Sequence, residues 1–200
     1  VSITGNVKMG EKNNLPYRVS GGYINQDGTL KTSNMERGTL SVNLSPVLLD
    51  NHLTINLNAK GTITNNRFAN QSAVGEAVRF DPTQPVYDEN GNNGYFWWGK
   101  NINATSNPVA SINDKLDLSN AKRFIGNAQI DYKIHGLEDL RLNLNLGVDV
   151  SKSNGSVDVA PGAEQSIHAT AEAGSGTHTN YSQLRRDQTL EFYGAYAKTL

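Results

Sequence analysis

Four consecutive aromatic residues, Tyr95, Phe96, Trp97 and Trp98, form the stretch of the sequence best suited to binding another molecule. The flat faces of aromatic rings can stack on sugar rings, and aromatic side chains are frequent at contacts between proteins. The same rings can instead pack the surrounding segment onto itself or lie in an aromatic belt at a membrane surface. We therefore interpret the cluster as a candidate contact for a ligand or a partner, and keep the purely structural interpretation beside it.

Residues that could bind a metal ion are present, but not in the spacings that metal sites use. Residues 88–93 place acidic and amide oxygens as the start of a calcium-binding loop does. Such a loop needs Gly at its sixth position and Glu at its twelfth, where this sequence has Asn93 and Gly99. No two histidines have the close spacing of a helical zinc site; they are His52, His135, His168 and His178. We predict no metal site.

No arrangement of residues indicates catalysis. Ser, Asp and His occur, but not in a nucleophile elbow, and no Gly-rich phosphate-binding loop precedes a helix. The chain has no cysteine, which excludes disulfides and thiolate metal sites. A formal net charge of −1 provides no basic surface for nucleic acid. We predict that the chain is not an enzyme, uses no cofactor and has no nucleic-acid partner.

Residues 140–150 show which kind of element positions these side chains. Every even position is Leu or Val, and every odd position is Arg, Asn, Gly or Asp. Because a strand directs successive side chains to opposite faces, this pattern predicts a strand with one aliphatic face and one polar face. It extends about 37 Å, enough for a membrane-crossing strand tilted by about 45°. On its polar face, Arg141, Asn143, Asn145 and Asp149 would line a lumen or be solvated as on any strand.

The same alternation recurs along most of the chain. Strands are predicted near residues 1–9, 16–26, 34–45, 52–66, 122–135, 139–152 and 182–200. Long loops are predicted at 67–121 and 153–181, and residues 71–80 of the first are compatible with a short helix. No apolar run is long enough for a membrane-spanning helix. Both ends of the chain already alternate, which suggests a piece of a longer protein.

Tight turns and longer connections alternate between these strands. The tight turns are 10–15, 45–51 and 135–139, and the longer connections are 26–34, 67–121 and 151–181. In an up-and-down meander, alternate connections lie at the same end of the sheet, so the tight turns gather at one end. Outer-membrane barrels have this layout, with short periplasmic turns and long extracellular loops. We predict an all-β fold, an antiparallel up-and-down meander of about seven strands within a larger transmembrane β-barrel.

A set of short motifs runs through nearly the whole chain, most clearly through residues 1–150. The motifs are residues 15–23, 25–34, 36–37, 43–46, 57–61, 66–69, 81–87 and 131–134. Together they resemble the barrel region of the SusC/RagA family of TonB-linked outer-membrane transporters of Bacteroidetes.

The resemblance implies a barrel of roughly 22 strands with an N-terminal plug in its lumen, in the outer membrane of a Gram-negative bacterium. It implies uptake of nutrients, glycans or peptides, with a SusD-like surface lipoprotein and the TonB complex as partners and outer-membrane lipid around the barrel. The aromatic cluster could then contact the lipoprotein. The plug and the TonB box are absent from residues 1–200, so we interpret the whole chain as a partial TonB-dependent receptor barrel domain.

Two other functions are compatible with the residues themselves. The first is a soluble secreted or surface β-protein that binds glycans through the aromatic loop. The second is a secreted β-rich enzyme, which is weaker because no pair of acids in a cleft can be identified. In a soluble sandwich, the even-numbered side chains of residues 140–150 would interdigitate with a second sheet. In a membrane barrel they would face lipid.

Overall fold

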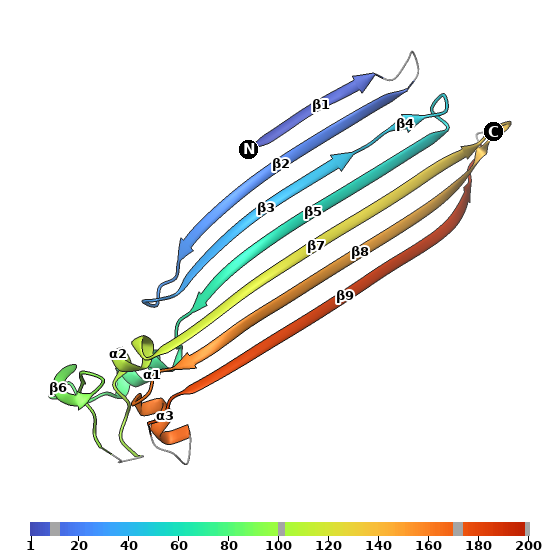
Figure 1. Ribbon diagram of the computed structural model, residues 1–200. Coiled ribbons are helices and arrows are strands. Elements are labelled where there is room, and N and C mark those ends of the chain that lie inside the picture. Colours follow the sequence, from blue (N-terminus) through green and yellow to red (C-terminus); the bar gives the residue numbers. More distant parts are fainter. Residues whose placement is uncertain (9–12, 100–102, 170–173, 199–200) are drawn as a thin grey trace.

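The long strands form one antiparallel sheet in the computed structural model, which describes residues 1–8, 13–99, 103–169 and 174–198 (Figure 1). The order across the sheet is β1-β2-β3-β5-β7-β8-β9, and the short β4 pairs with β2 and β5. The strands are β1 Ser2–Lys8, β2 Asn14–Asp27, β3 Asn34–Leu44, β4 Val47–Leu48, β5 Leu53–Phe68, β7 Lys115–Ile134, β8 Leu137–Val159 and β9 Thr177–Tyr196. This is the predicted meander, in which each long strand pairs with the next one along the chain.

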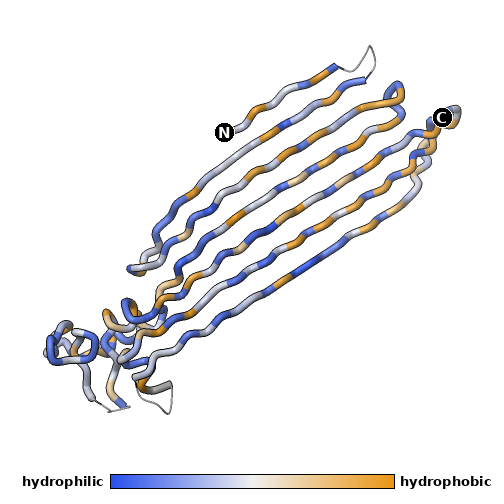
Figure 2. Tube along the Cα trace, in the orientation of Figure 1, coloured by the Kyte–Doolittle hydropathy of each residue, from blue (hydrophilic) through white to orange (hydrophobic). Residues whose placement is uncertain are grey.

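The register places the apolar residues of the long strands on one face. Leu57 of β5 pairs with Ala128 of β7, Ala128 pairs with Leu146 of β8, and Leu146 pairs with Leu190 of β9. Cross-strand partners point to the same side of a sheet, so these residues form one row. Hydrophobic and hydrophilic positions alternate along the strands (Figure 2). A register shift of one residue would turn a whole apolar set to the other face.

No second layer covers the apolar face within the described part of the chain. Leu40, Phe124 and Leu190 are 58%, 48% and 72% exposed. The buried hydrophobic residues among those described all lie in the segments between strands; they are Ala73, Ala110 and Ala163. A soluble sandwich would bury its apolar face against a second sheet. The exposed face is the arrangement expected for strands that contact lipid.

The two kinds of connection lie at opposite ends of the sheet, as predicted (Figure 1). The turns that follow β4 and β7 share one end, which we call the turn end, and β1 ends and β2 begins at that same end. Most of the predicted turn 10–15 lies outside the described residues. The connections that follow β2, β5 and β8 share the other, which we call the loop end.

The long connections contain short helices and one small strand. Helix α1, Ser72–Arg79, confirms the predicted helix, whereas β6 Tyr87–Asn92, α2 Pro108–Asn113 and α3 Glu164–Ala169 were not predicted. None of the helices in the described residues is both long and apolar enough to cross a membrane.

The predicted extents of the two long loops, 67–121 and 153–181, are wrong because β7, β8 and β9 continue into them. Strand β7 begins at Lys115 rather than near residue 122, β8 ends at Val159 rather than near 152, and β9 begins at Thr177 rather than near 182. Backbone pairing continues there, from Lys115 with Val159 onward. These segments are rich in Ser, Asn and Asp, and their apolar alternation is limited to Leu116 with Leu118 and Val157 with Val159, which is too short to reveal a strand. Strand β9 ends at Tyr196, and residues 199–200 lie outside the described residues.

Candidate functional site

The polar face of the sheet carries paired charges across β7, β8 and β9. The Arg123 guanidinium donates two hydrogen bonds to the Asp149 carboxylate, at 2.9 and 2.5 Å. On β9, Arg185 Nε donates to Asp187 Oδ2 at 2.7 Å. A bidentate pair fixes the direction of both side chains as well as their charges. These four charged groups are therefore held in place by their partners.

Amide side chains connect the same three strands closer to the turn end. Asn127 Nδ2 donates to Asn145 Oδ1 at 2.7 Å, and Asn145 Nδ2 donates to Glu191 Oε2 at 2.9 Å. Arg141 Nη1 lies 3.8 Å from Asp131 Oδ1. The predicted polar set of β8 thus lies on one face and is cross-linked to both neighbouring strands. Such a face presents fixed donors and acceptors to whatever fills the space beside it.

A small assembly lies at the loop end, and we call it the loop cap (Figure 1). It consists of the described residues of the two long connections, 69–114 and 160–176, which contain α1, β6, α2 and α3. Asn107 is 1% exposed and holds part of it together. Its Oδ1 accepts hydrogen bonds from the amides of Val109 and Ala110 at the start of α2, at 3.1 and 3.4 Å. Its Nδ2 donates to the Val86 carbonyl at 2.7 Å. One buried amide therefore caps a helix and anchors a neighbouring segment.

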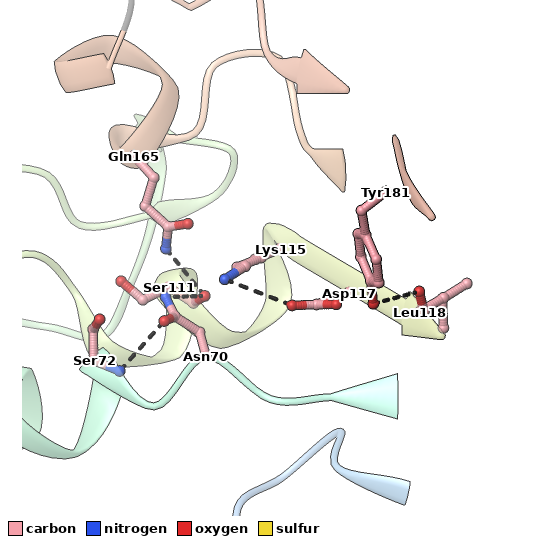
Figure 3. A network of polar contacts seen from close by, with 8 residues as sticks. All are labelled: Asn70, Ser72, Ser111, Lys115, Asp117, Leu118, Gln165 and Tyr181. Carbon is pink, nitrogen blue, oxygen red and sulfur yellow. Dashed lines mark hydrogen bonds and ion pairs between the residues drawn. The ribbon is translucent and has the colours of Figure 1, made fainter. Parts of the chain in front are cut away.

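A single backbone carbonyl joins the two long connections. The Ser111 oxygen accepts from Asn70 Nδ2 at 3.2 Å and from Gln165 Nε2 at 3.1 Å (Figure 3). Asn70 precedes α1, Ser111 lies in α2 and Gln165 lies in α3. Nearby, the Tyr181 hydroxyl of β9 donates to the Leu118 carbonyl of β7 at 3.3 Å (Figure 3). The helices of the loop cap are thereby tied to each other, and the Tyr181 hydrogen bond joins β7 and β9 close to them.

Two carboxyl groups in the loop cap have altered acidity. Burial raises the pKa of Glu76, and repulsion from Glu164 adds to this, although a hydrogen bond with Ser111 opposes it. Burial also raises the pKa of Asp114, against a hydrogen bond with Asn93. The loop cap therefore favours the neutral form of both acids more than water does.

The aromatic cluster predicted as a contact site belongs to the loop cap, where its side chains are half-buried. The Phe96 ring lies edge-on to those of Phe80 and Trp98, at centroid distances of 6.3 and 5.1 Å. Tyr95 lies 5.7 Å from Tyr87, and its hydroxyl accepts a hydrogen bond from Asn113 Nδ2 at 2.8 Å. These contacts pack the segment onto itself. A role of Tyr95, Phe96, Trp97 and Trp98 toward a ligand or partner stays a prediction.

The structure brings together two histidines that are far apart in sequence. The rings of His52 and His135 stack at 3.9 Å at the turn end. His52 Nε2 lies 3.3 Å from Glu138 Oε1, and the Tyr132 hydroxyl lies 2.9 Å from His135 Nδ1. The contact depends on two tight turns being neighbours, which no local motif reveals.

The other candidate metal-binding residues lie at the loop end. His178 pairs with Asp158, while His168 falls in α3 and its side chain is outside the described part of the structure. In residues 88–93, Asp88 Oδ1 accepts a hydrogen bond from the Asn90 amide at 3.0 Å, as in a polar turn. Among the described residues, no three acidic or histidine side chains gather as metal ligands would.

A one-layer meander with an uncovered apolar face, a paired polar face and its tight turns at one end is a wall segment of a membrane-spanning β-barrel. No protein-family profile matches the chain. It is 35% identical to the TonB-dependent receptor SusC of Bacteroides thetaiotaomicron over 221 aligned residues, which cover 100% of the chain. It is 30% identical to the TonB-dependent receptor P26 of Formosa agariphila over 159 residues, 77% of the chain. The chain therefore belongs to the SusC-like TonB-dependent receptors, which confirms the resemblance.

The chain spans 21% of the length of SusC and 15% of that of P26. It corresponds to part of the barrel of such a receptor, in the outer membrane of a Gram-negative bacterium. Both relatives are TonB-dependent receptors.

Proposed function

We propose that this chain forms part of the barrel wall of a TonB-dependent importer that takes up glycans or peptides together with a SusD-like surface lipoprotein. One observation carries the proposal: a single sheet combines an uncovered apolar face with a polar face of paired charges. Lipid is the natural environment for the first face, and a plug or passing solute for the second. The relationship to SusC across the whole chain supports the transport class.

In this proposal the polar face lines the lumen. The Arg123–Asp149 pair and the amide chain from Asn127 to Glu191 orient their donors and acceptors before a ligand arrives. Pre-oriented groups lose less entropy on binding than free side chains. Hydroxyl-rich glycans and peptides both present the hydrogen-bonding groups that such a face would contact.

The loop cap is the proposed region of ligand or lipoprotein contact. The aromatic cluster lies within it, and the apolar side chains of Val74 and Val78 on α1 are 55% and 82% exposed. Exposed apolar side chains beside aromatic rings are typical of surfaces that bind partners. TonB would act through parts of the receptor other than this sheet.

Uptake measurements test the proposal. A strain that lacks the receptor is complemented with the wild-type gene, and uptake of labelled oligosaccharides and oligopeptides is measured with and without a protonophore. We expect uptake of one ligand class to require the receptor and to stop with the protonophore, since TonB draws on the proton gradient. Uptake that continues with the protonophore would contradict a TonB-dependent mechanism. Equal uptake of both ligand classes in the deletion strain would contradict transport by this receptor.

Co-purification tests the partner separately. The affinity-tagged receptor is extracted from outer membranes, and bound proteins are identified by mass spectrometry. We expect a surface lipoprotein in near-equal amount. Its absence from a receptor that still imports would remove the lipoprotein from the proposal and leave transport standing.

A further inference from the structure

Two lysines face each other on the apolar side of the sheet, near its loop end. Lys122 of β7 is the direct cross-strand partner of Lys152 of β8. Ile63 of β5 lies beside Lys122 in the same row, and Leu184 of β9 lies beside Lys152. Both lysines are exposed. Two positive charges therefore stand between apolar neighbours at the edge of the lipid-facing surface.

This pair lacks an acidic partner within the described residues. The ion pairs of the sheet involve other cations, such as Arg123 with Asp149 and Arg185 with Asp187, and these lie on the opposite, polar face. Like charges directly across two strands destabilise a sheet. Arg186 adds a third positive charge, because it pairs with Val150 on the lysines' face and is the diagonal neighbour of Lys152. An anion bound here would offset the repulsion among the three cations.

An apolar trough of about 670 Å³ adjoins the lysines. Leu40, Ile63, Phe124 and Val150 line it together with Lys122 and Lys152. Its floor is open because glycines, which have no side chain, line it; they are Gly21, Gly38 and Gly61. A Cβ atom added at Gly38 or Gly61 would meet no other atom within 4 Å. The surface is thus a groove for an apolar chain with cations at one end.

We propose that Lys122, Lys152 and Arg186 bind a phosphate of lipid A, and that an acyl chain of the same molecule lies in the glycine-floored trough. The charges require an anion and the trough requires a hydrocarbon, so the occupant is an amphiphile with an anionic head. The lysines lie toward the loop end, which faces outward in outer-membrane barrels. The phosphorylated lipid of that leaflet is lipid A. The proposal rests on the outer-membrane location and not on the transported nutrient.

Native mass spectrometry of the receptor purified from outer membranes tests the headgroup site. The variant is Lys122→Gln with Lys152→Gln, and the matched control is Lys60→Gln, which removes a lysine on the polar face of β5. The probes are monophosphorylated lipid A, dephosphorylated lipid A and phosphatidylglycerol. We expect the double variant to bind monophosphorylated lipid A at least about tenfold more weakly, as charge-assisted contacts to phosphate are strong. The control should bind as the wild type does.

Three results would overturn the headgroup site. They are wild-type affinity in the double variant, equal binding of dephosphorylated lipid A, and equal binding of phosphatidylglycerol by the wild type. The heat-dependent gel mobility of the barrel verifies folding. The same mobility gives the unfolding temperature of the double variant as a second measurement. Without lipid this temperature should be higher than in the wild type, because the like-charge pair is gone. With lipid A bound it should be lower than in the wild type, because the variant binds the lipid more weakly.

Gly61→Val tests the trough itself. The added side chain points into open space and Val suits a strand, so the barrel should fold. We expect weaker binding of lipid A with all charges retained, because the filled trough excludes the acyl chain. Unchanged affinity in this variant would remove the acyl chain from the trough.

Discussion

At the scale of single residues, Glu76 shows how the loop cap depends on protonation. Its Oε2 atom is buried and has no hydrogen-bond partner among the described residues. The pKa of Glu76 is raised above its ordinary value of 4.5, first by burial. A raised pKa means that the folded cap favours the neutral acid. This stabilisation is present in full below the unfolded value and is lost as the pH rises through the folded pKa.

Glu76→Gln should therefore stabilise the loop cap at neutral pH, since Gln imitates the neutral acid and ends the repulsion from Glu164. We expect slower proteolysis of the cap than in the wild type at pH 7.5, and equal rates well below pH 4.5. Glu89→Gln, an exposed position in the same connection, serves as the control and should change neither rate. Faster cleavage of Glu76→Gln at neutral pH would contradict this assignment of the burial effect.

Contacts between residues close in sequence could be predicted, whereas contacts between distant residues could not. Asn107 directly before Pro108 is a start signal for a helix that the sequence shows, and it was missed in a segment interpreted as loop. The Arg123–Asp149 pair could not be predicted, because it depends on the register between β7 and β8. The aromatic cluster was identified from its composition, but its contacts with Phe80 and Tyr87 appear only in the fold.

At the scale of elements, strand β8 combines two environments along its length. Its middle alternates strictly between Leu or Val and polar residues, whereas its last part, 151–159, is mostly polar. The existence of β8 could be predicted from the alternation, because only a strand separates such residues onto two faces. Its loop-side end could not, because a strand that has left the lipid no longer needs an apolar face.

Leu146→Arg places a charge in the middle of the apolar row of β8. We expect it to destabilise the receptor barrel by about 2–4 kcal/mol, the cost of a charged side chain at the membrane midplane on the lipid face of a barrel. The measurement is reversible urea unfolding in lipid vesicles. Asn145→Arg, one residue away on the polar face, is the control and should cost much less. Equal losses from the two variants would be inconsistent with a lipid-facing Leu146.

At the scale of the whole molecule, the sheet is directional. Its tight turns lie at one end and its long connections at the other (Figure 1), which in an outer-membrane barrel separates periplasm from exterior. This layout could be predicted from connection lengths alone. The loop cap could not, since it forms from contacts between two connections, such as Gln165 with Ser111, whose partners are far apart in sequence.

Cysteine labelling on intact cells tests this direction. Lys31→Cys lies in the exposed connection between β2 and β3, and Glu138→Cys lies beside the turn between β7 and β8. Residues 1–200 contain no cysteine, and any cysteine elsewhere in the receptor is first replaced by serine. We expect a membrane-impermeant maleimide to label Lys31→Cys on intact cells and Glu138→Cys only after lysis. Labelling of Glu138→Cys on intact cells would mean that the turn end faces outward.

A nitroxide scan of residues 140–150, in the receptor reconstituted in lipid, tests the separation of the two faces most directly. Each position is replaced singly by a spin-labelled cysteine, and its accessibility to oxygen and to a water-soluble nickel complex is measured. Our account predicts that even positions are reached by oxygen, which concentrates in lipid, and that odd positions are shielded from lipid. Even positions that are shielded from both probes, as beneath a second protein layer, would contradict it.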